Sequence, residues 1–296
     1  MYIILDTETT GAEIEDRICQ LAFLFCDDNL NIIEHHSQLC QPPLPIKYEA
    51  MAVHHITPEM VKDAPPLHQT KAFRRLQELN TSNNTLVIHN AVFDLGMLKK
   101  ENFTNHMQLL DTLRCMRHLY PKNESNALQI LRYSLSLYQK ETAVAEALHV
   151  NIQAHDALGD VIVLYLLLHY LLRSHTKESL INTSAKPVFV SRLRFGKYRG
   201  RDIESVIKED YAYITWLLTN HEAAKNDEDL HYTVQLLLKK ETTIPGYRFS
   251  MGKYKGLLIE EIIQKDKGYL HWALDNMTHL DAHFKEAIQK VLKENG

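Results

Sequence analysis

The chain has 296 residues, of which 45% are hydrophobic and 24% charged, with only 10 glycines and 9 prolines. This composition excludes a fibrous or disordered protein and indicates a soluble folded chain with one sizeable domain and a smaller appended unit. The formal net charge of −4 excludes general attraction to nucleic acid, so phosphate binding would rest on local basic patches or bound metal ions.

The N-terminus, the longest apolar run and the cysteines bear on the cellular compartment. Residues 1–6 carry no basic group and too short an apolar run for a signal peptide. The longest apolar run, at 161–172, is shorter than the ~20 residues that a membrane span requires. No close pair occurs among the cysteines, which indicates buried thiols in a reducing compartment; they are Cys19, Cys26, Cys40 and Cys115. We therefore expect a cytoplasmic protein without a membrane segment.

Apolar and β-favouring runs alternate with helical patterns over the first 110 residues. Three β-favouring runs open the chain as a predicted meander, and two further runs follow after helical segments. Strands are predicted at 2–5, 18–25, 32–39, 85–89 and 108–110, and helices at 48–53, 67–79 and 93–100. Because strands alternate with helices, the sequence predicts an α/β sheet, followed by mainly helical structure to residue 172.

A segment near the C-terminus repeats itself 56 residues later (252 − 196). Residues 195–200, Phe-Gly-Lys-Tyr-Arg-Gly, return at 251–256 as Met-Gly-Lys-Tyr-Lys-Gly, and the register continues through Trp216 and Trp272. So many matches in one register predict a duplicated small module. The predicted parts are an α/β domain at 1–175, a polar linker at 176–188, a first copy at 189–222, a helical connector at 223–243 and a second copy at 244–296.

Three short segments place four carboxylates and a histidine at strand ends and helix starts. Asp6 and Glu8 lie two residues apart on the first strand, so both point to one face and could share a hard divalent cation. Asp94 follows the fourth strand where a helix begins. His155 and Asp160 would lie ~140° apart on one helix, so we expect His155 in the preceding loop. Singly, these residues have simpler interpretations: a solvated strand end, a helix cap or a surface histidine.

In this order the three segments resemble the exonuclease superfamily with four acidic residues and a histidine, which includes ribonuclease T and polymerase proofreading subunits. Within that superfamily the chain resembles the exodeoxyribonuclease X family. The further similar segments are 50–61, 115–121 and 195–200, together with Tyr213 and Trp216. The resemblance extends from residue 1 to about residue 220.

The resemblance implies a ribonuclease H-like α/β fold, with a mixed five-stranded sheet flanked by helices and small C-terminal α+β repeat modules. It implies a 3′→5′ DNA exonuclease that releases nucleoside monophosphates. Two Mg²⁺ or Mn²⁺ ions ~3.5 to 4 Å apart would be bridged by Asp6. Glu8 and Asp160 would hold the ion that activates water, and Asp94 would support the other. His155 would accept the proton from the attacking water.

The terminal nucleotide needs a pocket beside these carboxylates. The residues directly after the first motif could begin it, because the backbone of a glycine can approach a sugar closely. The resemblance places four further residues along the same cleft, of which Ile56 and Phe93 could equally belong to the core. The predicted pocket residues are Thr9, Thr10, Gly11, His54, Ile56, Asn90 and Phe93.

The repeated turns combine basic and aromatic residues, as a platform for single-stranded nucleic acid requires. The predicted accessory contacts are Lys197, Tyr198 and Arg199 in the first copy and Lys253, Tyr254 and Lys255 in the second. The simpler interpretation is a β-turn that positions the module. We expect Trp216 and Trp272 to be structural, within the small cores of the two copies.

DNA with a free 3′ end, single-stranded or duplex, is the expected partner. Two alternatives stay open. An RNA 3′ exonuclease would need the same carboxylates, and the 2′-hydroxyl is distinguished by pocket details that the sequence does not reveal. A nucleic-acid-binding or polymerase-associated proofreading subunit is the other, although a pure binding module has no need of clustered like charges. The oligomeric state and the preferred DNA end remain open.

Overall fold

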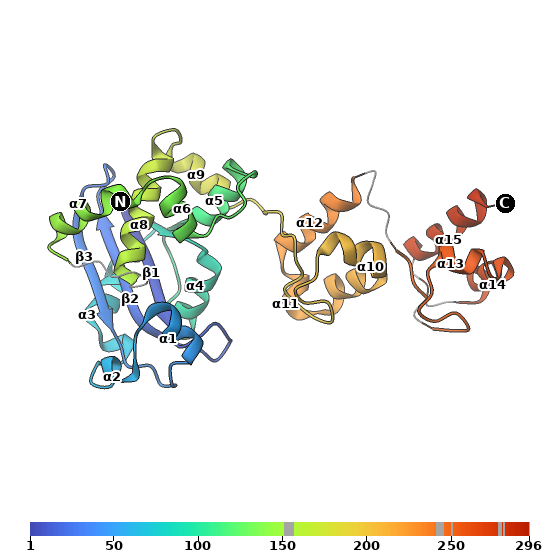
Figure 1. Ribbon diagram of the computed structural model, residues 1–296, viewed down its shortest axis with the longest axis horizontal. Coiled ribbons are helices and arrows are strands. Elements are labelled where there is room, and N and C mark those ends of the chain that lie inside the picture. The colour runs from blue at the N-terminus through green and yellow to red at the C-terminus, as the bar shows by residue number, and fades with distance from the viewer. Residues whose placement is uncertain (151–156, 241–245, 250, 278–279, 281, 296) are drawn as a thin grey trace. The chain divides into compact units, whose positions relative to one another are not determined.

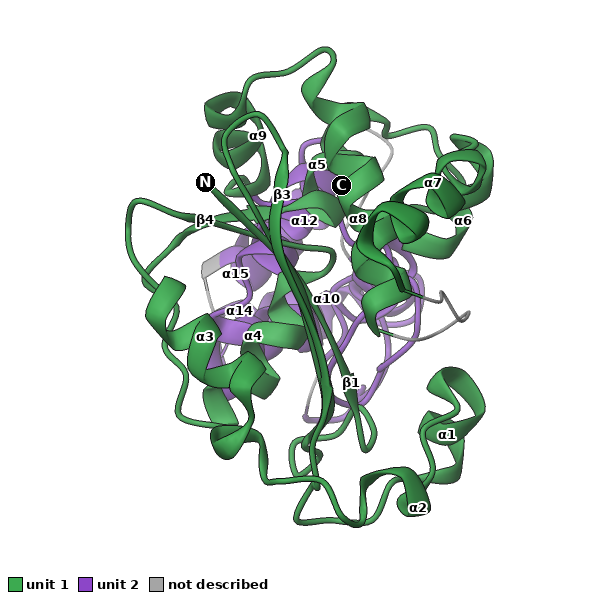
Figure 2. Cartoon of the chain, turned by 90° about the vertical axis from the view of Figure 1, so that its left-hand side faces the viewer, with its two compact units in different colours: residues 1–186 green, residues 187–296 purple. Residues whose placement is uncertain are grey.

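The structure of the protein is a computed structural model that describes residues 1–150, 157–240, 246–249, 251–277, 280 and 282–295. The chain divides into two compact units, Met1–Lys186 and Pro187–Gly296, shown in two colours in Figure 2. Each unit is described by itself below.

A mixed five-stranded sheet forms the centre of the first unit (Figure 1). The strands are β1 (Tyr2–Thr9), β2 (Ile18–Cys26), β3 (Ile32–Leu39), β4 (Thr85–Ile88) and β5 (Gln108–Asp111). In the order β3-β2-β1-β4-β5, the first three strands are antiparallel neighbours, and β4 and β5 run parallel to β1. This arrangement confirms the predicted mixed sheet of five strands.

Helices cover both faces of this sheet because β1 is buried on both sides. Ile4 packs with α5, α6 and α8 on one face, and Ile3 and Leu5 pack with α3 and α4 on the other. The helices of the unit are α1 (Tyr48–His54), α2 (Pro58–Val61), η1 (Leu67–Gln69), α3 (Lys71–Leu79), α4 (Ala91–Lys100), α5 (Thr112–Leu119), α6 (Leu128–Ser134), α7 (Tyr138–Leu148), α8 (Ala157–Leu172) and α9 (Lys177–Ser184). The result is a three-layer α/β/α domain.

Helix α9 lies within the segment 176–188 that the sequence predicts to be a linker. Its Leu180 is completely buried in the same core as α8, and the helix packs against α5 and β5. The backbone oxygen of Leu180 also accepts a hydrogen bond from Cys115 Sγ, at 3.3 Å. The structure therefore places residues up to Lys186 in the first unit, because Leu180 and the neighbouring Ile181 pack α9 against the core of that unit.

The second unit contains two small cores, one for each copy of the repeat. Its helices are α10 (Ile203–Asn220), α11 (Glu222–Lys225) and α12 (Glu228–Leu238), then α13 (Ile259–Ile263), α14 (Lys267–Asn276) and α15 (Ala282–Glu294). Helix α10 is kinked at Asp210, and α13 and α14 are separate helices at the corresponding place. Among the described residues, β-structure in each copy is a single bridge, Arg192 with Asp202 and Arg248 with Leu258.

Helices α11 and α12 occupy most of the predicted connector at 223–243, but they belong to the first copy. Leu230 and Val234 of α12 are buried in the core of that copy, as Phe284 and Ile288 of α15 are in the second. The repeating unit is therefore longer than the sequence motif, because its last helix retains an apolar ridge but few identical residues.

Two further expectations concern the thiols and the membrane. All four cysteines are buried and free, as predicted. None of the described helices is by itself long and apolar enough to cross a membrane. Helices α8 and α9 reach that length and composition only as a pair, which is bent by 111°.

Replacing Leu180 by alanine tests the packing of α9. Because this side chain is completely buried, we expect Leu180→Ala to lower the free energy of unfolding by about 2–5 kcal/mol. Ser179→Ala, at an exposed position of the same helix, is the matched control and should change it by less than about 0.5 kcal/mol. Urea unfolding followed by circular dichroism measures both. Equal effects of the two substitutions would contradict the packing of α9 on the sheet.

Candidate active site

Strand β1 presents two half-buried carboxylates to the face covered by α8. Side chains alternate between the faces of a strand, so Asp6 and Glu8 share the face of Ile4, which packs in the core that contains α8. The strand holds this register because it pairs with the fully buried β2, with Asp6 opposite Ala22 and Glu8 opposite Gln20.

Asp160 in the first turn of α8 completes a group of three carboxylates. Oxygen atoms of Asp6, Glu8 and Asp160 all lie within 4.8 Å of one another. The start of α8 is held by Gln20, whose Oε1 accepts a hydrogen bond from the backbone N–H of Ala157 at 3.3 Å. Because every donor in the group is a carboxylate oxygen, the site suits a hard divalent cation such as Mg²⁺ or Mn²⁺.

Asp94 on α4 reaches β1 from the opposite face of the sheet. Thr7, between Asp6 and Glu8, donates to Asp94 Oδ1 from its backbone N–H at 3.1 Å and from its hydroxyl at 2.7 Å. Asp94 thus lies beside the strand but is not a member of the group of three. Burial raises the pKa of Asp94 to about 7, the bonds from Thr7 oppose this increase, and the charge of Asp111 adds to it. A cation bound nearby would favour the ionised form.

Asp111 positions the start of α4 and was not predicted as part of the site. Its carboxylate accepts hydrogen bonds from the backbone N–H groups of Asn90 and Ala91, at 3.2 and 2.9 Å, and it also caps α5. Asn90 adopts the left-handed conformation, with φ of 78°, which asparagine tolerates better than most residues. The one signal in the sequence was an aspartate at the end of a strand and the beginning of a helix.

Gln129 on α6 is a second contact that the sequence did not reveal. Its Nε2 donates a hydrogen bond of 2.5 Å to Asp160 Oδ1. Gln129 Oε1 accepts one of 3.3 Å from Arg132, which is bound in turn by both oxygens of Glu141 on α7. This chain of side chains orients one oxygen of Asp160.

His155 lies outside the described residues, just before α8 begins at Ala157. The predicted loop position of this imidazole stays a prediction.

Thr9, Thr10 and Gly11 form the end of β1 and the turn that follows it. Thr10 is completely buried, and its hydroxyl donates to Asp16 Oδ1 at 2.8 Å. Burial would raise the pKa of Asp16, but hydrogen bonds from Lys47, from the Glu13 backbone and from Thr10 hold it below its ordinary value. A Cβ at Gly11 would lie 2.5 Å from Asp16 Oδ2, so this close approach requires glycine.

His54 and Ile56 are buried below this turn. His54 Nδ1 accepts from the backbone N–H of Ile56 at 3.0 Å, so Nε2 carries the proton that is donated to the Thr9 oxygen at 3.1 Å. Burial lowers the pKa of His54. Ile56 packs in a small core with Cys19 and Ile46. In contrast, Asn90 is exposed and Phe93 is half buried.

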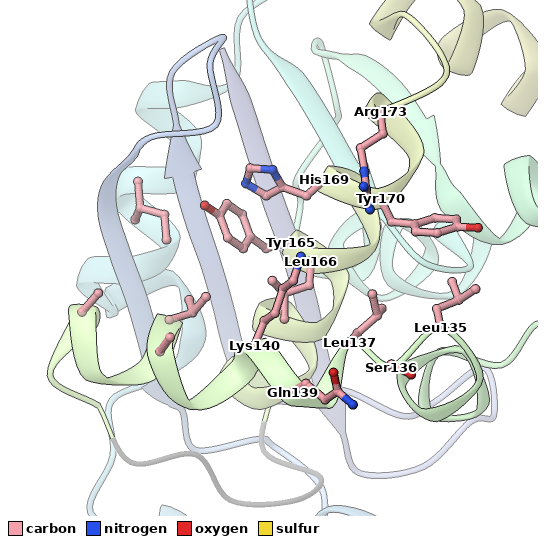
Figure 3. Close-up of a pocket in the computed structure, with 14 residues that line it drawn as sticks. Leu135, Ser136, Leu137, Gln139, Lys140, Tyr165, Leu166, His169, Tyr170 and Arg173 are labelled. Atoms are coloured by element: carbon pink, nitrogen blue, oxygen red, sulfur yellow. The ribbon is translucent and has the colours of Figure 1, made fainter.

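A hollow of about 570 Å³ lies between α7 and α8, as Figure 3 shows. Leu135 and Leu137 before α7 and Tyr165 and His169 of α8 are among its lining residues, which are mainly apolar. None of the four predicted metal-binding carboxylates lines this hollow. It is separate from the carboxylate group.

Clustered carboxylates of this kind are typical of metal-dependent hydrolases that act on phosphodiesters. The family model for exonucleases matches residues 3–168, which is more than half of the chain. The chain therefore belongs to the exonuclease family, as the resemblance implied. A second family model, for the exodeoxyribonuclease X-like C-terminal region, matches residues 193–222 and 249–277, one match in each copy of the repeat.

The chain is also similar to curated relatives and to a solved structure. Exodeoxyribonuclease 10 of Escherichia coli (strain K12) is 28% identical over 222 residues, covering 74% of this chain and 91% of the relative. DNA polymerase III subunit epsilon of Rickettsia prowazekii (strain Madrid E) is 31% identical over 173 residues, covering 55% and 69%. A structure of exonuclease X in complex with 5′ overhanging duplex DNA has 25% identity and a TM-score of 0.44, covering 62% of this chain and 100% of that one.

Gln129 provides a test of the support for Asp160. Changes to groups that orient a metal ligand typically cost about 10–100-fold in metal affinity or activity, and we expect Gln129→Ala to lower both by that amount. Gln139→Ala, the same change at an exposed position of α7, is the control and should leave both unchanged. Mn²⁺ titration and nuclease assays measure the two quantities. Wild-type values for Gln129→Ala would contradict an orienting role.

Proposed function

We propose that the protein is a 3′→5′ exonuclease that hydrolyses the terminal phosphodiester bond of DNA and releases nucleoside monophosphates. The observation that carries this proposal is the convergence of Asp6, Glu8 and Asp160, whose oxygen atoms lie within 4.8 Å of one another. Membership of the exonuclease family supports the reaction type. The similarity to a relative named as an exodeoxyribonuclease supports DNA as the substrate.

The close approach of the carboxylates causes electrostatic repulsion that a bound cation would offset. Like charges held this closely and half buried disfavour one another's ionised form, and a divalent cation removes that penalty. We assign Asp6, Glu8, Asp94 and Asp160 to the binding of two Mg²⁺ or Mn²⁺ ions. When bound, such ions supply Lewis-acid stabilisation of the negative charge that develops during phosphodiester hydrolysis. The paired bonds from Thr7 hold Asp94 against β1 for this role.

His155 is the proposed general base. Its support is the resemblance of the segment 155–160 to the histidine-containing motif of the superfamily, and the proximity in sequence of His155 to Asp160, a member of the carboxylate group. An imidazole titrates near neutrality and is suited to accept a proton from the attacking water.

The seven predicted pocket residues divide by exposure into two sets. We propose that Asn90, Phe93 and Gly11 contact the terminal nucleotide, since Asn90 is exposed and the other two are half buried. Thr9, Thr10, His54 and Ile56 are buried, and we propose that they hold the wall of the pocket in place.

We further propose the arrangement of the whole chain. The catalytic domain includes α9 and ends near residue 186, where the first compact unit ends. The two repeat modules provide accessory nucleic-acid contacts. Lys197, Arg199, Lys253 and Lys255 are exposed, with Tyr198 and Tyr254 half buried beside them. A cytoplasmic location is consistent with four buried free thiols.

The first test is degradation of a 5′-labelled single-stranded DNA oligonucleotide with Mg²⁺. We expect a ladder that shortens from the 3′ end, and a rate about 10²–10⁴-fold lower in His155→Ala because the general base is lost. His106→Ala removes an exposed imidazole and should degrade DNA at the wild-type rate.

An RNA of the same sequence completes this experiment. Weak degradation of RNA is the expected result. A ladder on RNA alone would support the proposed reaction but show that the substrate is RNA. No ladder on either polymer would favour a binding subunit over an enzyme.

Metal binding without DNA is a separate test. Loss of a ligand should cost at least as much as loss of a group that orients one, so we expect Asp6→Asn to weaken Mn²⁺ binding by about tenfold or more. Asp63→Asn, at an exposed position of the same unit, should bind Mn²⁺ as the wild type does. Electron paramagnetic resonance of free Mn²⁺ measures both. Equal affinities in the two variants would remove the metal site from the proposal.

A further inference from the structure

The first copy of the repeat presents an aromatic surface that the carboxylate group does not use. Trp216 of α10 is 51% exposed, and its ring centre lies 5.8 Å from that of Tyr213, at an interplanar angle of 30°. Tyr198 meets Tyr213 edge-on at 5.0 Å. Lys197 Nζ lies 4.4 Å from the centre of the Tyr198 ring. We call these four residues the first shelf.

The second copy repeats this surface. Trp272 of α14 is 50% exposed, and its ring centre lies 5.4 Å from that of Tyr269, at 31°. Tyr254 meets Tyr269 edge-on at 4.9 Å, and Lys253 Nζ lies 4.8 Å from the Tyr254 ring centre. These four residues are the second shelf. The expectation that both tryptophans lie within the module cores is therefore wrong.

The two shelves are identical in sequence, although the cores beneath them differ. Buried Leu193 of the first copy corresponds to Phe249 in the second, and buried Leu217 corresponds to Ala273. A half-exposed indole ring contributes less to stability than a buried side chain does. Packing alone therefore gives no reason for both copies to have a tryptophan at this position when the core residues beneath it differ. A tryptophan ring that is half exposed at the same place in both copies is available for contact with another molecule.

A carboxylate holds each shelf in a fixed arrangement. Asp210 accepts hydrogen bonds from Lys197 Nζ at 3.3 Å, from the Tyr198 hydroxyl at 3.0 Å and from the Tyr213 backbone at 3.2 Å. Asp266 accepts the same three bonds in the second copy, at 2.9, 2.9 and 3.0 Å. Both lysines are thereby held over aromatic rings before any ligand binds, which lowers the entropic cost of binding.

The turn at the edge of each shelf requires glycine. Gly196 has φ of +70°, and a Cβ there would lie 2.0 Å from the Tyr213 hydroxyl oxygen; Gly252 has φ of +85° and would meet Tyr269 in the same way at 2.3 Å. The turn thus has a structural role beneath the shelf, where it makes room for the tyrosine hydroxyl.

The surroundings of the first shelf are mainly cationic. A hollow of about 730 Å³ borders Trp216 and Tyr213, and its charged lining residues are Lys197, Arg248 and Lys255 against one carboxylate, Asp210. Residues 187–296 contain 17 Lys and Arg and 16 Asp and Glu, which gives a net charge of +1. Residues 1–186 contain the remaining 16 Lys and Arg and 21 Asp and Glu, which gives a net charge of −5. The charge of the second unit therefore suits a polyanion better than that of the first.

We propose that the two shelves bind single-stranded DNA, with unpaired bases stacked on Trp216 and Trp272 and phosphates beside the neighbouring lysines. Every base has a flat face that stacks on an aromatic ring, so such a site tolerates any sequence. In a duplex these faces are covered by neighbouring bases, which makes the single strand the matching form. This inference rests on the proposed function, and it gives the repeat modules the task of holding the strand whose 3′ end is hydrolysed.

Intrinsic fluorescence tests the proposal on the full-length chain. The chain has two tryptophans, and both are shelf residues, so tryptophan emission reports on the shelves alone. Titration with a single-stranded oligothymidylate in EDTA, which prevents cleavage, should quench the emission to saturation. In Trp216→Phe the remaining signal comes from Trp272, and the converse variant isolates Trp216.

Affinity measured with a labelled oligothymidylate then gives the size of each contribution. Trp216→Ala and Trp272→Ala should each weaken binding by about 5- to 150-fold, which corresponds to stacking of ~1–3 kcal/mol. The two Phe variants should retain most of the affinity. Tyr232→Ala removes an aromatic ring that is 38% exposed on α12, outside both shelves, and should bind as the wild type does. Unquenched emission, or equal affinities for all variants, would overturn the proposal.

Other nucleic acids and a small substrate complete the design. Tighter binding of duplex DNA would overturn the assignment to an unpaired strand, and tighter binding of RNA than of DNA would overturn the assignment to DNA. Hydrolysis of the p-nitrophenyl ester of thymidine 5′-monophosphate requires only the carboxylate site, so the shelf variants should hydrolyse it at the wild-type rate. No hydrolysis by any variant, with quenching as expected, would remove the proposed function and retain the shelves. Hydrolysis without quenching would retain the proposed function and rule out the shelves as a binding site.

Discussion

The alternation of side chains along β1 is the constraint on which the rest of the site depends. Asp6 and Glu8 face the layer that contains α8, while Thr7 between them faces the layer that contains α4, where it binds Asp94. Three consecutive residues thus bring carboxylates from both faces of the sheet to one strand. A shift of one residue in the pairing of β1 with β2 would exchange the two faces. The buried pairing of these strands, which keeps one register from Tyr2 to Glu8, is therefore a requirement of the chemistry as well as of the fold.

Neutral amide side chains support Asp160 and the helix that carries it. Gln20 fixes the first residue of α8, and Gln129 donates to Asp160. An amide can satisfy one oxygen of a carboxylate without neutralising it, so the negative potential that attracts a divalent cation is preserved. A lysine or arginine in the place of Gln129 would compete with the cation for the same oxygen. Gln129 thus supports Asp160 without adding a charge of its own to the carboxylate group.

The sequence predicted the parts of the site that depend on local periodicity. The two-residue period of a strand places Asp6 and Glu8 on one face, whereas the resemblance to the exonuclease superfamily adds Asp160 to them. Gln129 could not be predicted, because it meets Asp160 across 31 residues of chain and carries no motif. The sheet was also predictable from local pattern, because its strands are apolar runs bounded by turns.

The errors also have physical causes. Polar composition concealed Leu180, the completely buried side chain of α9. A module of this size has too small a core to bury every large side chain, so the size of Trp216 did not predict its burial. In both cases the burial of the side chain depends on how many apolar neighbours surround it in the folded protein. The sequence pattern does not reveal that number.

The charges of the two units explain why an exonuclease of this composition would need a separate binding surface. The catalytic unit carries a net charge of −5 and a carboxylate cluster, so its attraction for DNA depends on bound cations. A covalently attached surface raises the local concentration of the strand without adding contacts at the carboxylates. Stacking suits this task better than many ion pairs with phosphate do. Each stacked base contributes only ~1–3 kcal/mol and every base is accepted, so the strand can advance after each hydrolysis without the loss of all contacts at once.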